Sequence, residues 1–254
     1  MERRVGRWQV ATLVAAMTAG AGTAGAQQRP QEPANGAVFS ADVTVERAVV
    51  DGQGRVQREL PRSRYRIERF SGGRSRMVML ATTPEPRVGP MADAYAGLVV
   101  EFDAAAGGVR VLGKDGRPLP GAPPLTGNLM PVELTEGGDN TLVLTDETTA
   151  RRRDLTRQFG SRVGTLRRME RYLTKSGNRV QEVLVAPATA LPVEVNVVEG
   201  GVLEERHEFE YENRGRGRLV RTRMRSESRL PGAANERLVS VTTLSDVRMA
   251  GGVQ

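Results

Sequence analysis

The 254-residue chain contains no cysteine, a single histidine and only two lysines, Lys114 and Lys175. Without cysteine it can form no disulfide, no thiolate metal site and no N-terminal lipid anchor of the kind attached to cysteine. A lone histidine, His207, excludes histidine-clustered zinc sites. A Ser-His-Asp triad would have to use His207, and the sequence has no Gly-x-Ser-x-Gly elbow. We therefore expect no metal, no cofactor and no enzymatic activity.

Carboxylates are plentiful, so composition alone leaves open a hydrolase that uses a pair of catalytic acids. The acidic residues within 204–212, however, are interleaved with Arg206. That pattern is typical of a solvated strand face whose glutamates pair with arginines on the neighbouring strand. We read His207 in the same way, as a residue on the face of a sheet.

The first 26 residues have the pattern of a cleavable signal peptide. Three arginines precede a small apolar run over 10–21, and Ala24-Gly25-Ala26 supplies a small-x-small cleavage site. The run is shorter than the roughly 20 apolar residues that span a bilayer. We expect cleavage after Ala26, a flexible lead-in over 27–36, location in the periplasm or secretion, and no integral membrane span in the remainder.

The positive net charge does not predict a nucleic-acid partner. The chain has 37 basic and 30 acidic residues, and the first 26 hold three of the arginines and Glu2, so the remainder carries a formal charge of +5. Arginine and acidic residues alternate along many segments, which leaves no long block of one sign. A basic patch facing anionic lipid head groups remains compatible with this pattern.

Alternation of polar and apolar residues with period 2 predicts strands through most of the chain. Glycine-rich turns at 51–54, 71–73, 175–178 and 200–201 separate many of them. The predicted strands are 38–50, 55–70, 74–83, 98–102 and 109–112, followed by six at 163–174, 179–187, 191–199, 202–212, 218–230 and 236–249. Long consecutive strands with short turns favour an antiparallel sheet. We expect an all-β fold, a large curved antiparallel sheet forming an incomplete β-barrel, in one domain over 37–250.

One helix is predicted over 145–160 and is expected to pack at the opening of the barrel. Thr145 or Asp146 can cap its start, and Gly160 can adopt the left-handed conformation that ends it. Leu155 and Phe159 lie four residues apart, so its apolar face is narrow. Pro61 indicates a break or an edge position in its strand, and the proline-rich segments 84–97 and 118–131 are read as irregular loops.

The order of these segments resembles the periplasmic lipoprotein-carrier superfamily of the LolA and LolB type. The resemblance is carried by "YRIERF" and "RMVML", the helix-containing connection, the Pro-led hairpin "LPVEVNVVEGGVLEERHEFEYE" and the terminal "TTLSDVRM", and it covers most of 37–249. It implies a half-open β-barrel that carries a lipid or a lipoprotein acyl chain without catalysis. No functional residue of that family is recognised in this sequence, so none is transferred.

The apolar faces of the predicted strands supply the candidate ligand-binding residues. These are Phe39, Val43, Tyr65, Ile67, Met77, Met79, Val195, Val197, Phe209, Tyr211 and Met224. The same pattern is also typical of an ordinary packed core, because periodicity identifies a buried face and not a cavity. Two functions follow: binding or transport of a hydrophobic ligand or lipoprotein, or an envelope protein-protein interaction or sensing module with a packed, ligand-free interior.

Overall fold

The computed structural model describes residues 36–80, 96–103, 108–119, 143–144, 148–160, 162–166, 168–214, 219–233 and 235–249. The expected signal peptide, nearly all of the lead-in, and the two candidate cap residues of the helix lie outside these ranges. So do 84–95 and 120–131, which are most of the two segments read as irregular loops. The expectations for those parts therefore stay predictions.

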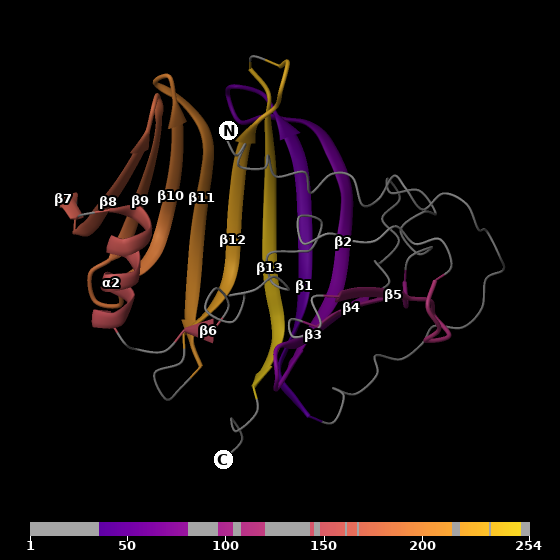
Figure 1. Cartoon of the computed structure of the whole chain (residues 1–254). Helices are drawn as coiled ribbons and strands as arrows, with labels where there is room; N and C mark the ends of the chain where they lie inside the picture. Colours follow the sequence, from indigo (N-terminus) through magenta and orange to yellow (C-terminus); the bar gives the residue numbers. More distant parts are fainter. Residues whose placement is uncertain are drawn as a thin grey trace. The chain divides into compact units, whose positions relative to one another are not determined.

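The described residues form thirteen strands and one helix (Figure 1). The amino-terminal strands are β1 (Ala37–Val50), β2 (Val56–Phe70), β3 (Arg74–Met79), β4 (Val99–Asp103), β5 (Gly108–Leu112) and β6 (Val143–Leu144). Helix α2 (Thr148–Phe159) follows. The remaining strands are β7 (Arg162–Leu166), β8 (Met169–Ser176), β9 (Arg179–Ala186), β10 (Leu191–Glu199), β11 (Val202–Asn213), β12 (Leu219–Arg229) and β13 (Arg237–Met249).

The strands pair in the order β5-β4-β3-β2-β1-β13-β12-β11-β10-β9-β8-β7, and β6 pairs with β12. Within the described residues β5 and β7 end this order, so the sheet is not closed. The predicted all-β class, open antiparallel sheet and short helix are confirmed. One boundary is wrong: the segment 163–174 forms two strands, β7 and β8, with Arg168 between them at φ 73°.

Local chemistry explains the turns. Between β1 and β2, Asp51 Oδ1 accepts hydrogen bonds from the backbone N–H groups of Gln53 and Arg55, each at 2.9 Å. Gly72 and Gly73, at φ 80° and 78°, occupy backbone conformations that cost other residues energy. Pro61 lies inside β2, before Tyr65, where the described pairing with β3 begins. The residues that would continue this pairing lie outside the described ranges, so the edge position stays a prediction.

The chain divides into two compact units, and β1, β2 and β13 each contribute residues to both. Among the described residues, the first unit contains 36–43, 63–80, 96–103, 108–119 and 245–249. The second contains 44–62 and the described residues from 143 to 244. The expectation of a single domain over 37–250 stays a prediction.

In the second unit, α2 packs on β8 and β9. Leu155 of the helix joins Tyr172, Val183 and Val185 in a buried cluster, with Phe159 and Val195 against it, so the predicted narrow apolar stripe is confirmed. Gly160 ends the helix at φ 82°, and a Cβ there would lie 2.9 Å from the carbonyl oxygen of Leu173. Glycine is therefore required for both conformation and space.

Polar contacts fix the same helix. Arg152 donates to buried Glu170 at 3.1 Å and to the carbonyl oxygen of Pro187 at 2.6 Å. Arg151 donates to the carbonyl oxygen of Thr189 at 2.6 Å. These bonds hold the helix to the turn between β9 and β10. No helix in the described ranges is long and apolar enough to cross a membrane.

Candidate functional site

Six of the predicted ligand-binding residues lie in the first unit. Tyr65 is opposite Met79, and Ile67 is opposite Met77, so these four share one face. The row continues from Met77 to Val100 of β4 and then to Val111 of β5. All the predicted residues here except half-buried Met79 are buried, with exposed fractions of 7% or less: Phe39, Val43, Tyr65, Ile67 and Met77. Their role in ligand binding stays a proposal, and such burial fits a packed core.

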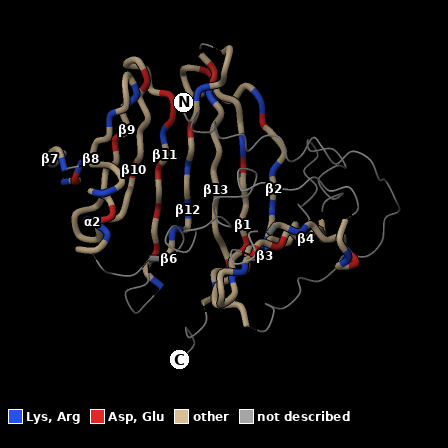
Figure 2. Tube along the Cα trace, viewed as in Figure 1, with Lys and Arg blue, Asp and Glu red and all other residues tan. Residues whose placement is uncertain are grey.

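The other five lie in the second unit, where the two faces of β9 to β13 differ in chemistry. One face carries a charged ladder, defined as Glu182, Glu194, Asn196, Arg206, Glu208, Arg225, Glu227 and Arg237. Figure 2 shows acidic residues along β11 and basic residues along β12. Residues that lie directly opposite each other on neighbouring strands are close enough to interact, so these opposite charges come side by side.

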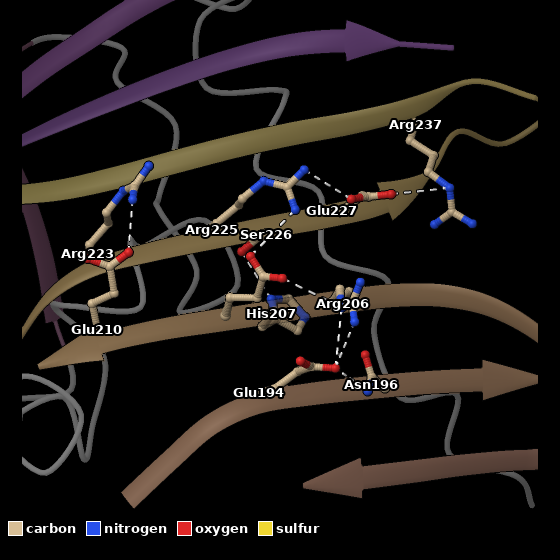
Figure 3. A network of polar contacts seen from close by, with 11 residues as sticks. Glu194, Asn196, Arg206, His207, Glu210, Arg223, Arg225, Ser226, Glu227 and Arg237 are labelled. Atoms are coloured by element: carbon tan, nitrogen blue, oxygen red, sulfur yellow. Dashed lines mark hydrogen bonds and ion pairs between the residues drawn. The ribbon is translucent and has the colours of Figure 1, made fainter. Parts of the chain in front are cut away.

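The charged ladder pairs within itself (Figure 3). Arg206 contacts Glu194 at 3.0 Å and Glu208 at 3.7 Å. Arg225 contacts Glu208 at 3.6 Å and Glu227 at 3.2 Å, and Arg237 reaches Glu227 at 3.3 Å. The cross-strand arginine partners predicted for the β11 glutamates are thus confirmed for Glu208, and also for Glu210, which accepts from Arg223 at 2.8 Å.

The opposite face carries the apolar candidates. Val183 is opposite Val195, Val195 is opposite His207, and His207 is opposite Ser226, so this face is the one that α2 covers at β8 and β9. Val195 packs against the buried cluster under the helix, and Val197 is 3% exposed. Such burial fits a packed core, and their role in ligand binding stays a proposal.

Further along this face lies the aromatic patch, defined as Phe209, Tyr211, Arg221 and Met224. Phe209 lies directly opposite Met224, and Tyr211 lies opposite Arg221. Phe209, Tyr211 and Met224 are half-buried, whereas Arg221 is buried. The patch therefore brings together three of the predicted residues and one arginine that the sequence did not indicate.

A β-bulge explains why Arg221 was missed. Counting by twos from Met224 places Thr222 and Val220 on its face and Arg221 on the other. Between Glu210 and Tyr211 the register shifts by one residue, so that Thr222 has no partner of its own on β11. The guanidinium carbon of Arg221 lies 5.4 Å from the centre of the Phe209 ring, a cation-π distance.

Burial controls the ionisation of Tyr211. Loss of solvent around its phenol raises the pKa of Tyr211 to about 12, while the charge of Arg221 acts in the opposite direction. The hydroxyl therefore remains protonated, and able to donate a hydrogen bond, throughout the neutral range.

The single histidine lies beside the aromatic patch. His207 stacks near Phe209, with ring centres 6.5 Å apart. Its Nδ1 is 3.0 Å from Ser226 Oγ, and its Nε2 is 3.4 Å from Glu205 Oε2. The hydrogen bond with His207 lowers the pKa of Glu205, and burial opposes this shift.

Such a Ser-His-Glu chain resembles part of a hydrolase triad, but Ser226 lies within β12, which pairs with β11 and β13 at this residue. The backbone N–H groups of a strand paired on both sides serve the sheet, which leaves none for an oxyanion hole there. The contacts fit the sheet-face interpretation of His207. The described residues also contain no group of three or more acidic, histidine or cysteine side chains able to hold a metal ion.

No family model matches the sequence, and no curated protein was found similar to it. Among solved structures, the chain is similar to a LolA superfamily protein, NE2245 from Nitrosomonas europaea, with 15% identity, a TM-score of 0.47 and coverage of 83% of this chain and 85% of that one. The Pseudomonas aeruginosa MucA/MucB complex matches with 12% identity, a TM-score of 0.24 and coverage of 83% and 93%. A member of the superfamily named by the sequence resemblance is thus among the solved structures to which the chain is similar.

Proposed function

We propose that this protein binds a hydrophobic ligand, the acyl chain of a lipid or lipoprotein, in the periplasm or outside the cell, and that it does so without catalysis. The observation that carries the proposal is the aromatic patch. Its aromatic and thioether side chains are only half-buried, although they lie on the same face as the buried cluster under α2. The apolar surface of Phe209 and Met224 is therefore available to an aliphatic chain.

The charged ladder on the other face excludes that side as the acyl-chain site. Its ion pairs would have to be desolvated to receive an apolar chain, and desolvation of charged groups costs more than the contact returns. Methionine adapts to ligands of varied shape because its thioether chain is flexible. The aromatic patch is therefore the better site for an acyl chain.

The expected strength of binding suits a carrier. Burial of about ten methylene groups contributes on the order of 8 kcal/mol before costs. Loss of translational freedom and ordering of the chain remove much of this. We therefore expect reversible binding of modest affinity.

The test is extraction of lipid from protein exported by its own signal and purified without detergent, followed by native mass spectrometry. We expect a bound acyl-containing species, and its loss from the double variant Phe209→Ala, Met224→Ala. Val239→Ala is the matched control, because Val239 is also half-buried but lies on the face of the charged ladder. Uniformly empty wild-type protein would contradict the proposal.

A second candidate, an envelope protein-protein interaction or sensing module, is favoured by the first unit. The row from Ile67 through Met77 and Val100 to Val111 is almost fully buried, as a packed interior requires. Capture of a defined envelope partner by lipid-free protein, unaffected by the double variant, would support this function over the first.

A further inference from the structure

The only histidine of the chain lies next to the aromatic patch, on the same face of the sheet. His207 precedes Phe209 by two residues on β11, and the two rings are inclined by 15° with their centres 6.5 Å apart. The His207 side chain keeps 29% of its surface exposed, and Phe209 is half-buried. An aliphatic chain that covers Phe209 should therefore also remove water from the imidazole ring.

Both ring nitrogens of His207 have partners that suit either protonation state. The lowered pKa of Glu205 keeps its carboxylate ionised at neutral pH, and an ionised carboxylate can only accept, so Nε2 donates to it from the neutral and the charged ring alike. The hydroxyl of Ser226, 3.0 Å from Nδ1, can donate to the neutral ring or accept from the charged one. Protonation thus breaks neither contact, and it changes the charge beside the patch without rearranging the strands.

Few charged groups lie close to His207 within the described residues. The neighbouring strands place uncharged side chains directly opposite it, Val195 on β10 and Ser226 on β12. On its own strand Glu205 favours the charged ring, and Arg179 of β9, 3.7 Å from Glu205, opposes that charge. The carboxylate that contacts the ring is therefore itself close to a cation, which limits how strongly it holds the proton.

The other charged or titratable groups of this face lie beyond these neighbours. Arg221 contacts the Phe209 ring, and Tyr211 lies opposite Arg221. From α2, which packs on β8 and β9, Arg152 contacts Glu170 of β8. Arginine, tyrosine and carboxylate side chains ordinarily keep one charge state from pH 5 to 8, whereas imidazole, with an ordinary pKa of about 6.5, does not. Among the described groups of this face, the imidazole is therefore the one expected to change charge in that range.

From this arrangement we propose that the aromatic patch releases its hydrophobic ligand in acid, because protonation of His207 opposes burial of the ring beneath that ligand. This rests on the proposed function and adds the regulation of that same site. Loss of water disfavours the charged form of a titratable group. Coupling between two binding events is reciprocal, so a ligand that displaces the proton from the ring is itself bound less tightly once the ring is protonated.

The experiment measures the affinity of delipidated protein for oleyl alcohol at pH 8 and at pH 5, below the concentration at which the alcohol aggregates. Oleyl alcohol does not titrate in this range, so a change in affinity belongs to the protein. We expect binding to be about three- to tenfold weaker at pH 5, and the NMR signals of the single imidazole to titrate at lower pH when the alcohol is bound.

The outcomes separate the two proposals. Equal affinity at the two pH values would overturn this inference and leave the proposed function standing. Failure of the alcohol to bind at either pH would overturn both.

Variants locate the effect. His207→Gln keeps hydrogen-bonding groups but does not titrate, so it should bind the alcohol equally at both pH values. Glu208→Gln is the matched control, because Glu208 lies next along β11 but pairs within the charged ladder, and it should keep the wild-type pH dependence. If His207→Gln does not fold, Glu205→Gln serves instead: without this carboxylate the ring is harder to protonate, and the fall in affinity should move to lower pH. Wild-type pH dependence in every folded His207 and Glu205 variant would refute the assignment.

Discussion

The two faces of β9 to β13 are built from the same strands but are stabilised by different physics. The charged ladder consists of partly exposed ion pairs, and exposed pairs contribute little because water screens them. The opposite face buries Val183 and Val185 of β9, together with Tyr172 of neighbouring β8, beneath α2, where apolar burial stabilises strongly. Stability should therefore depend on one face far more than on the other.

The largest effect is expected on the helix-covered face. Val183 is fully buried, so Val183→Asp places a charge without a partner in the core and should cost about 4 kcal/mol of unfolding free energy. Thr243→Asp introduces the same side chain at an exposed position on the other face. Urea titration followed by circular dichroism measures the loss of unfolding free energy in both variants. Similar losses would contradict the expected difference between the two faces.

The next effect concerns the attachment of α2. Arg152→Met removes a partner of buried Glu170 and should cost about 2 kcal/mol, because Arg162 remains 3.4 Å away and Arg152 is itself partly solvated. Arg157→Met, on the same helix but with an 83% exposed side chain, should change stability by less than about 0.5 kcal/mol. Adding Glu170→Gln to Arg152→Met should recover part of the loss in the same urea titrations.

Alkaline pH tests the aromatic patch. Because the folded-state pKa of Tyr211 is raised, the contribution of Tyr211 to the free energy of unfolding is fully present below pH 10. It is lost as the pH rises through about 12. Across this pH interval the free energy of unfolding of the wild-type protein should therefore fall by about 2 kcal/mol more than that of Tyr211→Phe. Burial also raises the pKa of Tyr172, so the unfolding free energy of Tyr211→Phe still falls with pH, but less steeply than that of the wild type. The same dependence of unfolding free energy on pH in both proteins would contradict the assignment.

The smallest effect is expected on the charged ladder. Arg225→Met removes the contacts to Glu208 and Glu227 and should cost about 0.5 kcal/mol. Screening should shrink this difference in 1 M salt relative to dilute buffer. A loss comparable to that of Arg152→Met would show that the ladder stabilises the sheet as strongly as the helix does.

Much of the local structure followed from sequence pattern. The hairpin of β10 and β11 and the glycine turns lie where period 2 and turn chemistry place them. The stop of α2 at Gly160 was equally readable. The division into β7 and β8 was not, because Arg168 takes a left-handed conformation that its residue type does not indicate.

The candidate site was predictable only in part. Phe209 and Met224 were both selected from alternation, and the structure places them opposite each other. Val195 and Val197 were selected by the same rule, and the structure places Val195 against the buried cluster and leaves Val197 3% exposed. Alternation did not indicate this burial, because periodicity does not report what covers a face.

The amino-acid sequence by itself determined the all-β class, the turns and the alternation of polar with apolar residues, because these depend on neighbours along the chain. Which side chains meet was decided by pairing between strands distant in sequence. A single unpaired residue, Thr222, moves Arg221 onto the face of Phe209 and Tyr211. Such a shift changes the chemistry of a site, and it arises because a one-residue change of register reverses the direction in which every later side chain points.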